Sequence, residues 1–198
     1  MPGANYRAAA NTLLRDTILD ALRVLLTSRN WRSVTMTDVA AEAGLSRQSI
    51  YNEFGSRRGL AQAYAMRLTD GFVAVVDTAL YQHVDNLDAA LRQGYLTFFG
   101  LSATDPMVLS LQTVDAPDDL LRLITTDSEV LVLRASGHLA DTLQRCWVAA
   151  PKRQANILAR AVVQLAIGYI SKPPIDPEDT ATDLAELLTP YMESFRAS

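Results

Sequence analysis

The fold of this chain is decided by residues 35–60, which read TMTDVAAEAGLSRQSIYNEFGSRRGL. Thr35 and Ser46 are of residue types that favour the N-cap of a helix. Gly44 and Gly55 stand where glycine commonly ends a helix. The stretch therefore predicts two short helices separated by a three-residue turn, with a longer helix starting just after Gly55.

Apolar residues recur at steps of three and four positions along almost the whole chain, which predicts an all-α protein. Beyond the quoted stretch, we expect helices at about residues 8–28, 56–81, 88–103, 126–147, 151–169 and 177–196, with short helices starting at Pro106 and Pro117. Asp88 is the expected N-cap of its helix. Thr126 and Glu129 form an expected capping box.

Composition narrows the class of protein. The chain has 198 residues, of which 49% are hydrophobic, enough for a substantial core. Stretches of about 18 apolar residues without charge are missing, and the N-terminus MPGANYRAAANTLLRD lacks the apolar block of a signal peptide. We therefore expect a cytoplasmic protein that does not enter a membrane. The one cysteine, Cys146, is expected to be buried and unreactive.

Charge is distributed unevenly along the chain. Residues 1–67 carry nine Arg and Lys against five Asp and Glu, a net charge of +4. Residues 68–198 carry nine against seventeen, a net charge of −8. The split suggests a small basic module that faces a polyanion, joined to an acidic body that does not.

The second short helix suits DNA reading because its apolar and polar positions separate onto two faces. Ile50 and Phe54 turn inward, which leaves outward the side chains of Arg47, Gln48, Tyr51 and Asn52. Two short helices supported by a longer first helix form a helix-turn-helix, whose second helix enters the major groove. Arg47 can donate to guanine or phosphate, and Gln48 can bond an adenine edge.

Phosphate contacts are expected from a second set of side chains, namely Thr35, Ser46, Tyr51 and Arg57. The N-termini of the neighbouring helices would add backbone N–H donors. The expected macromolecular partner is therefore double-stranded DNA.

The quoted stretch resembles the DNA-binding signature of the TetR family of bacterial transcriptional regulators, approximately T-x-x-x-I-A-x-x-A-G-V-S-x-x-x-x-Y-x-x-F-x-S-K-x-x-L. The matching positions are Thr35, Val39, Ala40, Ala43, Gly44, Ser46, Tyr51, Phe54, Ser56 and Leu60. RDTILDALRVLLTSRNW, residues 15–31, is similar to the family's lead-in. The later part is similar, more loosely, to actinobacterial members tied to lipid or alkane metabolism and export.

Three residues depart from that signature. Asn30 replaces the usual glycine, and we expect it to adopt the left-handed turn that Asn tolerates. Arg57 stands where lysine is common. Gly59 is expected to weaken the first turn of the long helix by about 1 kcal/mol relative to alanine.

The resemblance implies a helix-turn-helix domain of three helices at residues 1–55 and a helical ligand-binding and dimerisation domain at residues 56–198. It also implies a homodimer with two reading helices about 34–36 Å apart on a palindromic operator. The last two helices are broadly apolar, as a two-fold four-helix interface requires. The expected interface residues, which would also suit the core of one chain, are Leu158, Val162, Leu165, Leu184, Leu187, Leu188 and Tyr191.

The expected effector pocket lies between the long joining helix and the last two helices, where aromatic residues and methionine gather. Its apolar members, which ordinary core packing also explains, are Phe72, Tyr95, Phe98, Phe99, Met107, Leu111, Leu143 and Trp147. Arg134 and His138, one helical turn apart, are the expected contacts for an acidic head group. Solvent exposure is the alternative for these two.

Together these features predict a ligand-responsive repressor that a small hydrophobic effector, such as a long-chain fatty acid or ester, releases from DNA. No cofactor and no metal site are expected. A DNA-binding or architectural regulator without an effector is the alternative. Enzymatic activity is not expected, because the one conceivable catalytic group, His138 and Asp141 near Ser136, is better explained as a surface pair on a helix.

Overall fold

The computed structural model describes residues 2–194, with side chains from residue 9 onward, and over this range the chain is all helical, as predicted. The elements are α1 (Pro2–Ser28), the 3-10 helix η1 (Trp31–Ser33), α2 (Met36–Glu42), α3 (Arg47–Phe54), α4 (Arg57–Gln82), α5 (Leu87–Thr104), α6 (Pro106–Leu111), α7 (Asp118–Ile124), α8 (Glu129–Arg145), α9 (Lys152–Ser171) and α10 (Pro177–Ser194).

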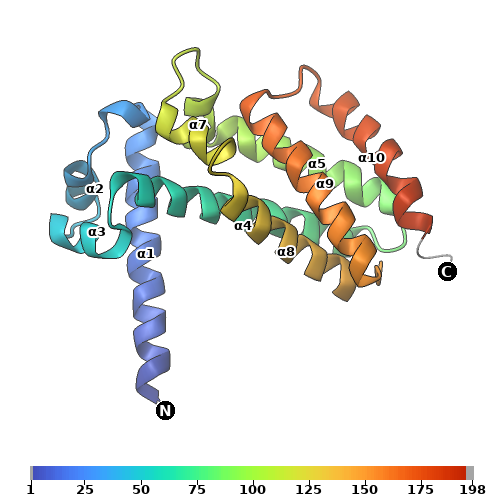
Figure 1. The fold of residues 1–198 in the computed structure, drawn as a ribbon, viewed down its shortest axis with the longest axis horizontal. Helices are drawn as coiled ribbons and strands as arrows, with labels where there is room; N and C mark the ends of the chain where they lie inside the picture. The colour runs from blue at the N-terminus through green and yellow to red at the C-terminus, as the bar shows by residue number, and fades with distance from the viewer. Residues whose placement is uncertain (1, 195–198) are drawn as a thin grey trace.

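The first three α-helices form the helix-turn-helix unit. Ile18 and Leu22 of α1, Val39 of α2 and Ile50 of α3 are fully buried and pack into one cluster. Figure 1 shows α2 and α3 on one side of α1, at one end of the molecule. The turn between them needs Gly44, whose φ of +66° is strained for residues with a side chain.

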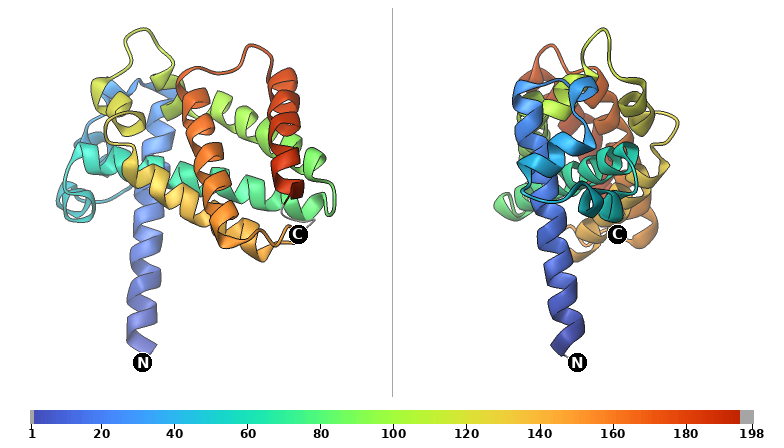
Figure 2. Two further views of the ribbon diagram at one scale, coloured as in Figure 1. Left: turned by 45° about the vertical axis from the view of Figure 1, so that its right-hand side comes forward. Right: turned by 90° about the vertical axis from the view of Figure 1, so that its left-hand side faces the viewer.

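The long helix α4 connects this unit to the body. It starts beside α3 and continues between α5 and α8, both of which it contacts. In the body α10 packs on α5, and α9 packs on α8. Figures 1 and 2 show α10 at the end of the molecule far from α3. A shift of α4 would therefore change its packing both against the reading helix and against the helices of the body.

Most helix starts follow the predicted caps, but two do not. Thr35 and Ser46 cap α2 and α3 with their side chains, as predicted, and α6 starts at Pro106, as predicted, with Asp105 as its side-chain cap. The N-cap of α5 is Asn86, which accepts from the Ala89 amide, so the prediction of Asp88 is wrong. The predicted capping box at Thr126 is also wrong: α8 follows Ser128, which caps it without a side-chain bond. The α7–α8 connection supplies backbone bonds instead, such as Asp127 N to Arg122 O at 2.8 Å.

Two predictions about α1 and its exit are corrected. The helix begins at Pro2, not near residue 8, because the alanine-rich lead-in has high helix propensity. Asn30 is not left-handed: its φ is −74°, and its side chain accepts from the Ser33 amide to cap η1. The side chain thus stabilises the turn by a hydrogen bond, without a strained backbone.

Gly59 stands at a position where the backbone leaves no room for a side chain, which helix propensity alone does not indicate. A Cβ on residue 59 would stand 2.0 Å from the carbonyl oxygen of Phe54. The tight turn at Gly55, where φ is +70°, turns that oxygen toward the first turn of α4. Glycine is therefore the residue that fits, and the interpretation of Gly59 as a local weakness is wrong.

Within the described residues, no helix combines the length and apolarity that spanning a membrane requires.

Candidate DNA-reading helix and candidate effector cavity

The outward face of α3 presents the predicted polar side chains. Ile50 is fully buried and Phe54 is 8% exposed, which fixes the roll of the helix. Arg47, Gln48 and Asn52 are exposed on the opposite face. The N-terminal half of a reading helix is the part that reaches base edges, and Arg47 and Gln48 lie there.

Hydrogen bonds between successive turns order this face. Gln48 Nε2 donates to Asn52 Oδ1 at 2.7 Å, so the two amides lie together. Arg47 donates to the hydroxyl of Tyr51 at 3.4 Å and lies over its ring, 5.2 Å from the centroid. These pairs restrict side-chain motion before DNA binds, so that less conformational entropy is lost on binding.

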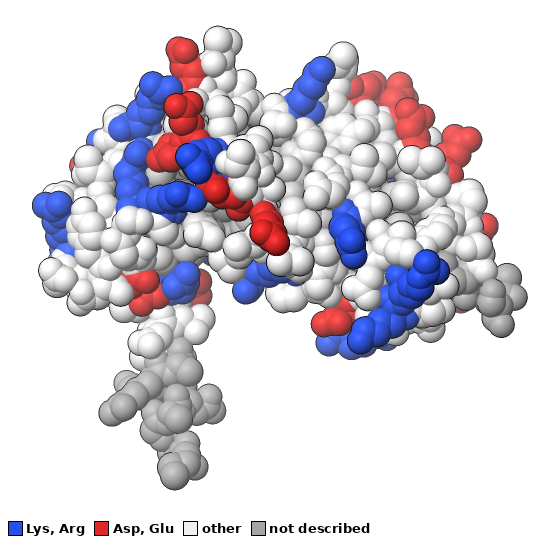
Figure 3. Space-filling model, in the orientation of Figure 1, with Lys and Arg blue, Asp and Glu red and all other residues white. Residues whose placement is uncertain are grey.

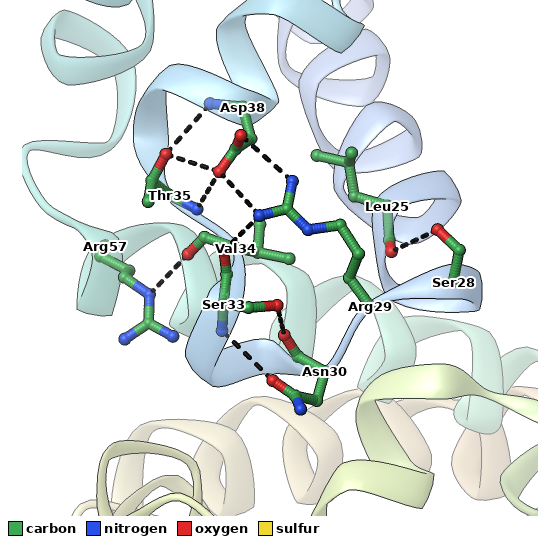
Figure 4. Close-up of polar contacts among 9 residues, drawn as sticks. All are labelled: Leu25, Ser28, Arg29, Asn30, Ser33, Val34, Thr35, Asp38 and Arg57. Atoms are coloured by element: carbon green, nitrogen blue, oxygen red, sulfur yellow. Dashed lines mark hydrogen bonds and ion pairs between the residues drawn. The ribbon is translucent and has the colours of Figure 1, made fainter.

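Thr35 and Asp38 form a complete capping box at the start of α2 (Figure 4). Thr35 Oγ1 donates to Asp38 Oδ2 at 2.6 Å, and the backbone amides of the two residues donate to each other's side chains at 2.8 and 3.2 Å. Arg29 pairs with Asp38 at 3.1 Å. The Arg29 guanidinium, with Thr35, holds the pKa of Asp38 well below its usual range. Asp38 therefore keeps its charge at neutral pH.

The Arg57 guanidinium is partly buried and directed toward η1, not toward the outward face of α3. Its Nε donates to the carbonyl of Val34 at 3.2 Å (Figure 4), and another of its nitrogens donates to the carbonyl of Trp31. The guanidinium also lies 4.1 Å from the centroid of the Trp31 ring. Arg57, predicted as a phosphate contact, thus ties α4 to the end of η1.

Asp119 of α7 completes this arrangement and was missed by sequence reasoning. Its Oδ2 accepts from Trp31 Nε1 at 2.8 Å and from Arg57 Nη1 at 3.2 Å. The three residues lie up to 88 positions apart, so local pattern gave no signal. We call Trp31, Arg57 and Asp119 the junction triad.

A second ionic contact supports the same junction. Asp127 pairs with Arg58 at 2.7 Å and with Arg122 at 3.1 Å. Figure 3 shows basic and acidic side chains close together where the helix-turn-helix unit meets the body. Part of the N-terminal positive charge is therefore used within the molecule.

The body contains a cavity of about 130 Å³ that is partly open to solvent and is lined by residues of α4 to α10. This is about ten times the space that one water molecule needs. The lining is apolar apart from Thr69 and Tyr95, and comes from Ala65, Leu68, Thr69, Phe72, Val73, Val76, Leu80, Ala90, Leu91, Gly94, Tyr95, Phe98, Met107, Val108, Leu111, Leu120, Leu123, Ile124, Leu131, Ala135, Leu139, Leu143, Leu158, Val162, Val163, Ala166, Ile167, Ile170 and Met192.

Six of the ten residues expected around an effector lie in this wall, namely Phe72, Tyr95, Phe98, Met107, Leu111 and Leu143. The other four lie elsewhere. Phe99 packs edge-on against Tyr169, with ring centroids 5.2 Å apart. Trp147 donates its indole N–H to the carbonyl of Leu80 at 2.6 Å.

Arg134 and His138 point away from the cavity. Arg134 donates two hydrogen bonds to the Asp70 carboxylate, at 2.8 and 2.7 Å, and His138 Nδ1 lies 3.4 Å from the same group. Their neighbours Leu131, Ala135 and Leu139 supply the cavity-facing side of α8. Helical spacing thus separates Arg134 and His138 from the cavity.

The residues expected at a dimer interface fall into two groups. Leu158, Leu184 and Leu188 are buried within the chain, Leu165 is partly buried, and Val162 lines the cavity. Leu187 of α10 is 67% exposed and Tyr191 is 37% exposed, and Ile157 of α9 is 44% exposed. The outer faces of α9 and α10 therefore carry apolar side chains.

Two segments of the chain match known families. Residues 18–64 match the family described as bacterial regulatory proteins, tetR family. Residues 86–190 match the bacterial tetracyclin repressor, C-terminal domain. Together the two matches include the helix-turn-helix unit and most of the helices around the cavity.

Several bacterial transcriptional regulators are similar to this chain over nearly its whole length. The HTH-type transcriptional regulator AlkX of Mycobacterium tuberculosis is 51% identical over 188 residues, which cover 95% of this chain and 89% of that protein. The crystal structure of the TetR family repressor AlkX from Dietzia sp. strain DQ12-45-1b, implicated in biodegradation of n-alkanes, is 40% identical, with a TM-score of 0.85 over 91% of this chain and 96% of that one. FadR from Thermus thermophilus, 18% identical, shares the fold alone, with a TM-score of 0.57 over 88% of this chain and 92% of that one.

Proposed function

The chain belongs to the TetR family of bacterial transcriptional regulators, and on that premise we propose that it is a homodimeric repressor released from its operator by a hydrophobic effector. The family is non-enzymatic, so its function is binding. We propose a long-chain fatty acid or ester as the effector. The Dietzia AlkX repressor is implicated in n-alkane biodegradation, which supports control of genes that act on hydrocarbons or their lipid products.

One observation carries the proposal: the cavity wall is continuous with the core of the helix-turn-helix unit. Met107, Leu111, Leu120, Leu123 and Leu131 line the cavity and belong to the cluster that contains the core of α1–α3. A ligand that displaces these side chains would therefore also disturb the packing that holds the reading helix in position. Close-packed interiors transmit such displacements, because they leave few voids to absorb them.

The physical requirement on the effector is a difference in affinity between two states. The dimer must hold its two reading helices at the spacing of successive major grooves. An effector that binds more tightly to a dimer with another spacing stabilises that state. The free energy of operator binding is then weakened by the difference between the effector's binding free energies to the two states. A difference of about 1–3 kcal/mol corresponds to roughly 5- to 150-fold.

The proposed dimer uses the outer faces of α9 and α10. Leu187 and Ile157 expose apolar surface that no described residue covers, and α10 lies far from the DNA-reading end (Figures 1 and 2). Pairing these faces would bury that surface in a four-helix interface, which the two-fold symmetry of most homodimers allows. It would leave both reading helices free for DNA.

The proposed DNA contacts are those of α3 and its flanks. Arg47, Gln48 and Asn52 would read base edges in the major groove. Ser46, Thr35 and Tyr51 remain the proposed phosphate contacts. Because Arg57 bonds inside the junction triad, its proposed part in DNA binding is to position α4 beside α3.

The test is operator release by a defined lipid. An operator duplex would be selected from a random-sequence library with the purified protein, and its affinity measured by fluorescence anisotropy during titration with methyl dodecanoate. We expect an affinity loss within the 5- to 150-fold range. Unchanged operator affinity, with no lipid bound, would favour the regulator without an effector.

A matched pair of variants on α6 connects the release to the cavity. Leu111→Trp fills the cavity, since Leu111 lines its wall and is 8% exposed. Leu109→Trp adds the same bulk on the outer face, where Leu109 is 45% exposed. We expect the first variant to lose the lipid response and the second to keep it.

A further inference from the structure

The last two helices carry opposite charges. Residues 142–175, from the end of α8 to the turn after α9, contain five Arg and Lys and no Asp or Glu. Residues 176–194, which include α10, contain six Asp and Glu and no Arg or Lys. A segment of net charge +5 is therefore followed directly by a segment of net charge −6.

These charges gather at two corners of the body. Figure 3 shows basic side chains at the lower right, over the turn from α8 to α9, and acidic side chains at the upper right, around the start of α10. Three exposed residues on each side define what we call the basic corner, Arg145, Lys152 and Arg153, and the acidic corner, Glu178, Asp179 and Asp183. One acidic residue, Asp141, lies a turn before Arg145 on α8.

The two corners do not pair with each other within one chain. None of their six side chains forms an ion pair with another described residue. The Arg145 side chain donates only to the backbone carbonyl of Asp141, at 3.2 Å. Figures 1 and 2 show that α9 and α10 run in opposite directions, so their charged N-terminal parts lie on opposite sides of the body.

Helix stability does not account for the basic corner. Lys152 and Arg153 open α9, whose first turn has no acidic residue. The N-terminus of a helix is the positive end of its dipole, so cations there are unfavourable. Glu178 and Asp179 do suit the start of α10. The basic corner is therefore the one that an external negative surface would stabilise.

Exposed apolar side chains lie on the same face as the charges. Ile157 follows Arg153 by four residues on α9, and Leu187 follows Asp183 by four residues on α10. Both apolar side chains are exposed, and helical residues four positions apart share a face. The face thus has an apolar centre and a charged rim, which is the usual composition of a protein–protein interface.

A two-fold axis along the length of the molecule would bring unlike corners together. In Figures 1 and 3 this axis is horizontal, with the reading helix at the left end and both corners at the right. Half a turn about it exchanges top and bottom, which sets a partner's acidic corner opposite the basic corner. Both reading helices then stay at one end, as a shared operator requires. Half a turn about the vertical axis would set like charges opposite each other and the reading helices at opposite ends.

We propose that this face binds a second copy of the chain with the basic corner of each protomer against the acidic corner of its partner. The inference rests on the proposed homodimer and names the charges that orient it. By symmetry the contact occurs twice, on either side of the apolar centre. Complementary charges speed the encounter in this orientation, and like charges oppose the reversed one.

Salt gives the first test, because it screens charges and leaves apolar contacts in place. The dissociation constant of the dimer would be measured on the whole chain, without DNA, by sedimentation with fluorescence detection. We expect the constant to rise roughly 3- to 30-fold between about 50 mM and about 500 mM NaCl. A constant that is unchanged or falls with salt would overturn the pairing of unlike corners.

Charge reversal gives the second test. Arg153→Glu and Asp183→Lys should each weaken the dimer by roughly 3- to 30-fold, because each sets like charges against each other twice. Arg153→Glu also removes an unfavourable cation from the start of α9, so a weaker dimer cannot come from a less stable helix. Charges act across about 8–10 Å at ordinary salt, so the test does not depend on one exact contact.

The double variant is the decisive case. Arg153→Glu combined with Asp183→Lys restores unlike charges at both contacts, and its dissociation constant should return to within about 3-fold of the wild-type value. Arg23→Glu is the matched control, since Arg23 is exposed on α1 in the helix-turn-helix unit, away from both corners. It makes the same charge change and should leave the dimer as it was.

The outcomes separate this inference from the proposed function. If neither reversal weakens the dimer, or if the double variant is as weak as the sum of its two changes, the corners belong to some other partner and the inference is overturned. The proposed homodimeric repressor would still stand. If the wild-type chain is a monomer at micromolar concentration, the proposed homodimer fails, and the inference fails with it.

Discussion

The indole nitrogen of Trp31 donates a hydrogen bond to the carboxylate of Asp119 at 2.8 Å, and this bond joins the helix-turn-helix unit to α7. The neighbours of Asp119 on the inner side of α7, Leu120 and Leu123, line the cavity. One short helix thus lines the cavity with one face and contacts the DNA-binding unit through its acidic start. We therefore expect α7 to be a second route, beside α4, by which a ligand in the cavity affects the reading helix.

Removing the Asp119 carboxylate should therefore weaken the response to the effector. In Asp119→Ala, the ratio of operator affinities without and with methyl dodecanoate should fall by roughly 2- to 30-fold, equivalent to 0.5–2 kcal/mol of coupling. Asp118→Ala is the control, because Asp118 is exposed beside it and lies outside the junction triad. An unchanged ratio in Asp119→Ala, or an equal fall in the control, would count against α7 as a route.

Gly59→Ala should destabilise the fold, against the usual preference of helices for alanine. The new Cβ would overlap the carbonyl oxygen of Phe54, so α3 and α4 must move apart. We expect a loss of about 1–3 kcal/mol, or roughly 2–12 °C in melting temperature. Gly71→Ala on the same helix meets nothing within 4 Å and should be neutral or stabilising. An unchanged melting temperature for Gly59→Ala would show that the turn accommodates a Cβ at this position.

Gln48→Ala should lower sequence discrimination more than overall DNA affinity. Gln48 is exposed in the first turn of α3, with its amide bonded to that of Asn52. We expect a cost of about 1–3 kcal/mol at one base pair per half-site, measured as operator against random duplex. Equal losses on the two duplexes would remove Gln48 from base reading.

Leu187→Glu should give a monomer with an intact fold. Leu187 is 67% exposed, so its side chain adds little to the core of one chain, while a charge at its position would be buried in the proposed interface. Leu133→Glu on α8, where Leu133 is 65% exposed, is the matched control and should remain a dimer. Sedimentation velocity at micromolar concentration distinguishes the two. A dimeric Leu187→Glu protein would place the interface elsewhere.

Local signals in the sequence were sufficient for the helices and for the reading face. Apolar spacing and capping residues placed α3 correctly, because Ser46 and Gly55 act within one or two turns of the chain. The same reasoning failed at Asn30 and Asp88, where an alternative side-chain cap close by was equally possible. Helix propensity also gave the wrong expectation for Gly59, because the carbonyl oxygen of Phe54, across a turn, excludes a side chain there.

Long-range relationships had no sequence signal. Asp119 meets Trp31 only because the body folds back onto the helix-turn-helix unit. Val162 has the pattern of an interface residue, yet it lines the cavity, because α9 is apolar over much of its surface and its roll cannot be read from spacing. Arg134 and His138 share one outer face of α8, and only the position of Asp70 shows that they are paired.

If the cavity and the operator site are coupled, the effects of their two ligands must be reciprocal. Thermodynamic linkage requires the operator to weaken lipid binding by the same factor by which the lipid weakens operator binding. The dissociation constant of methyl dodecanoate would be measured with the free dimer and with the dimer saturated by operator duplex. We expect the operator complex to bind the lipid roughly 5- to 150-fold more weakly, matching the loss of operator affinity. Equal lipid affinity in the two states would mean that the cavity and the operator site are not coupled.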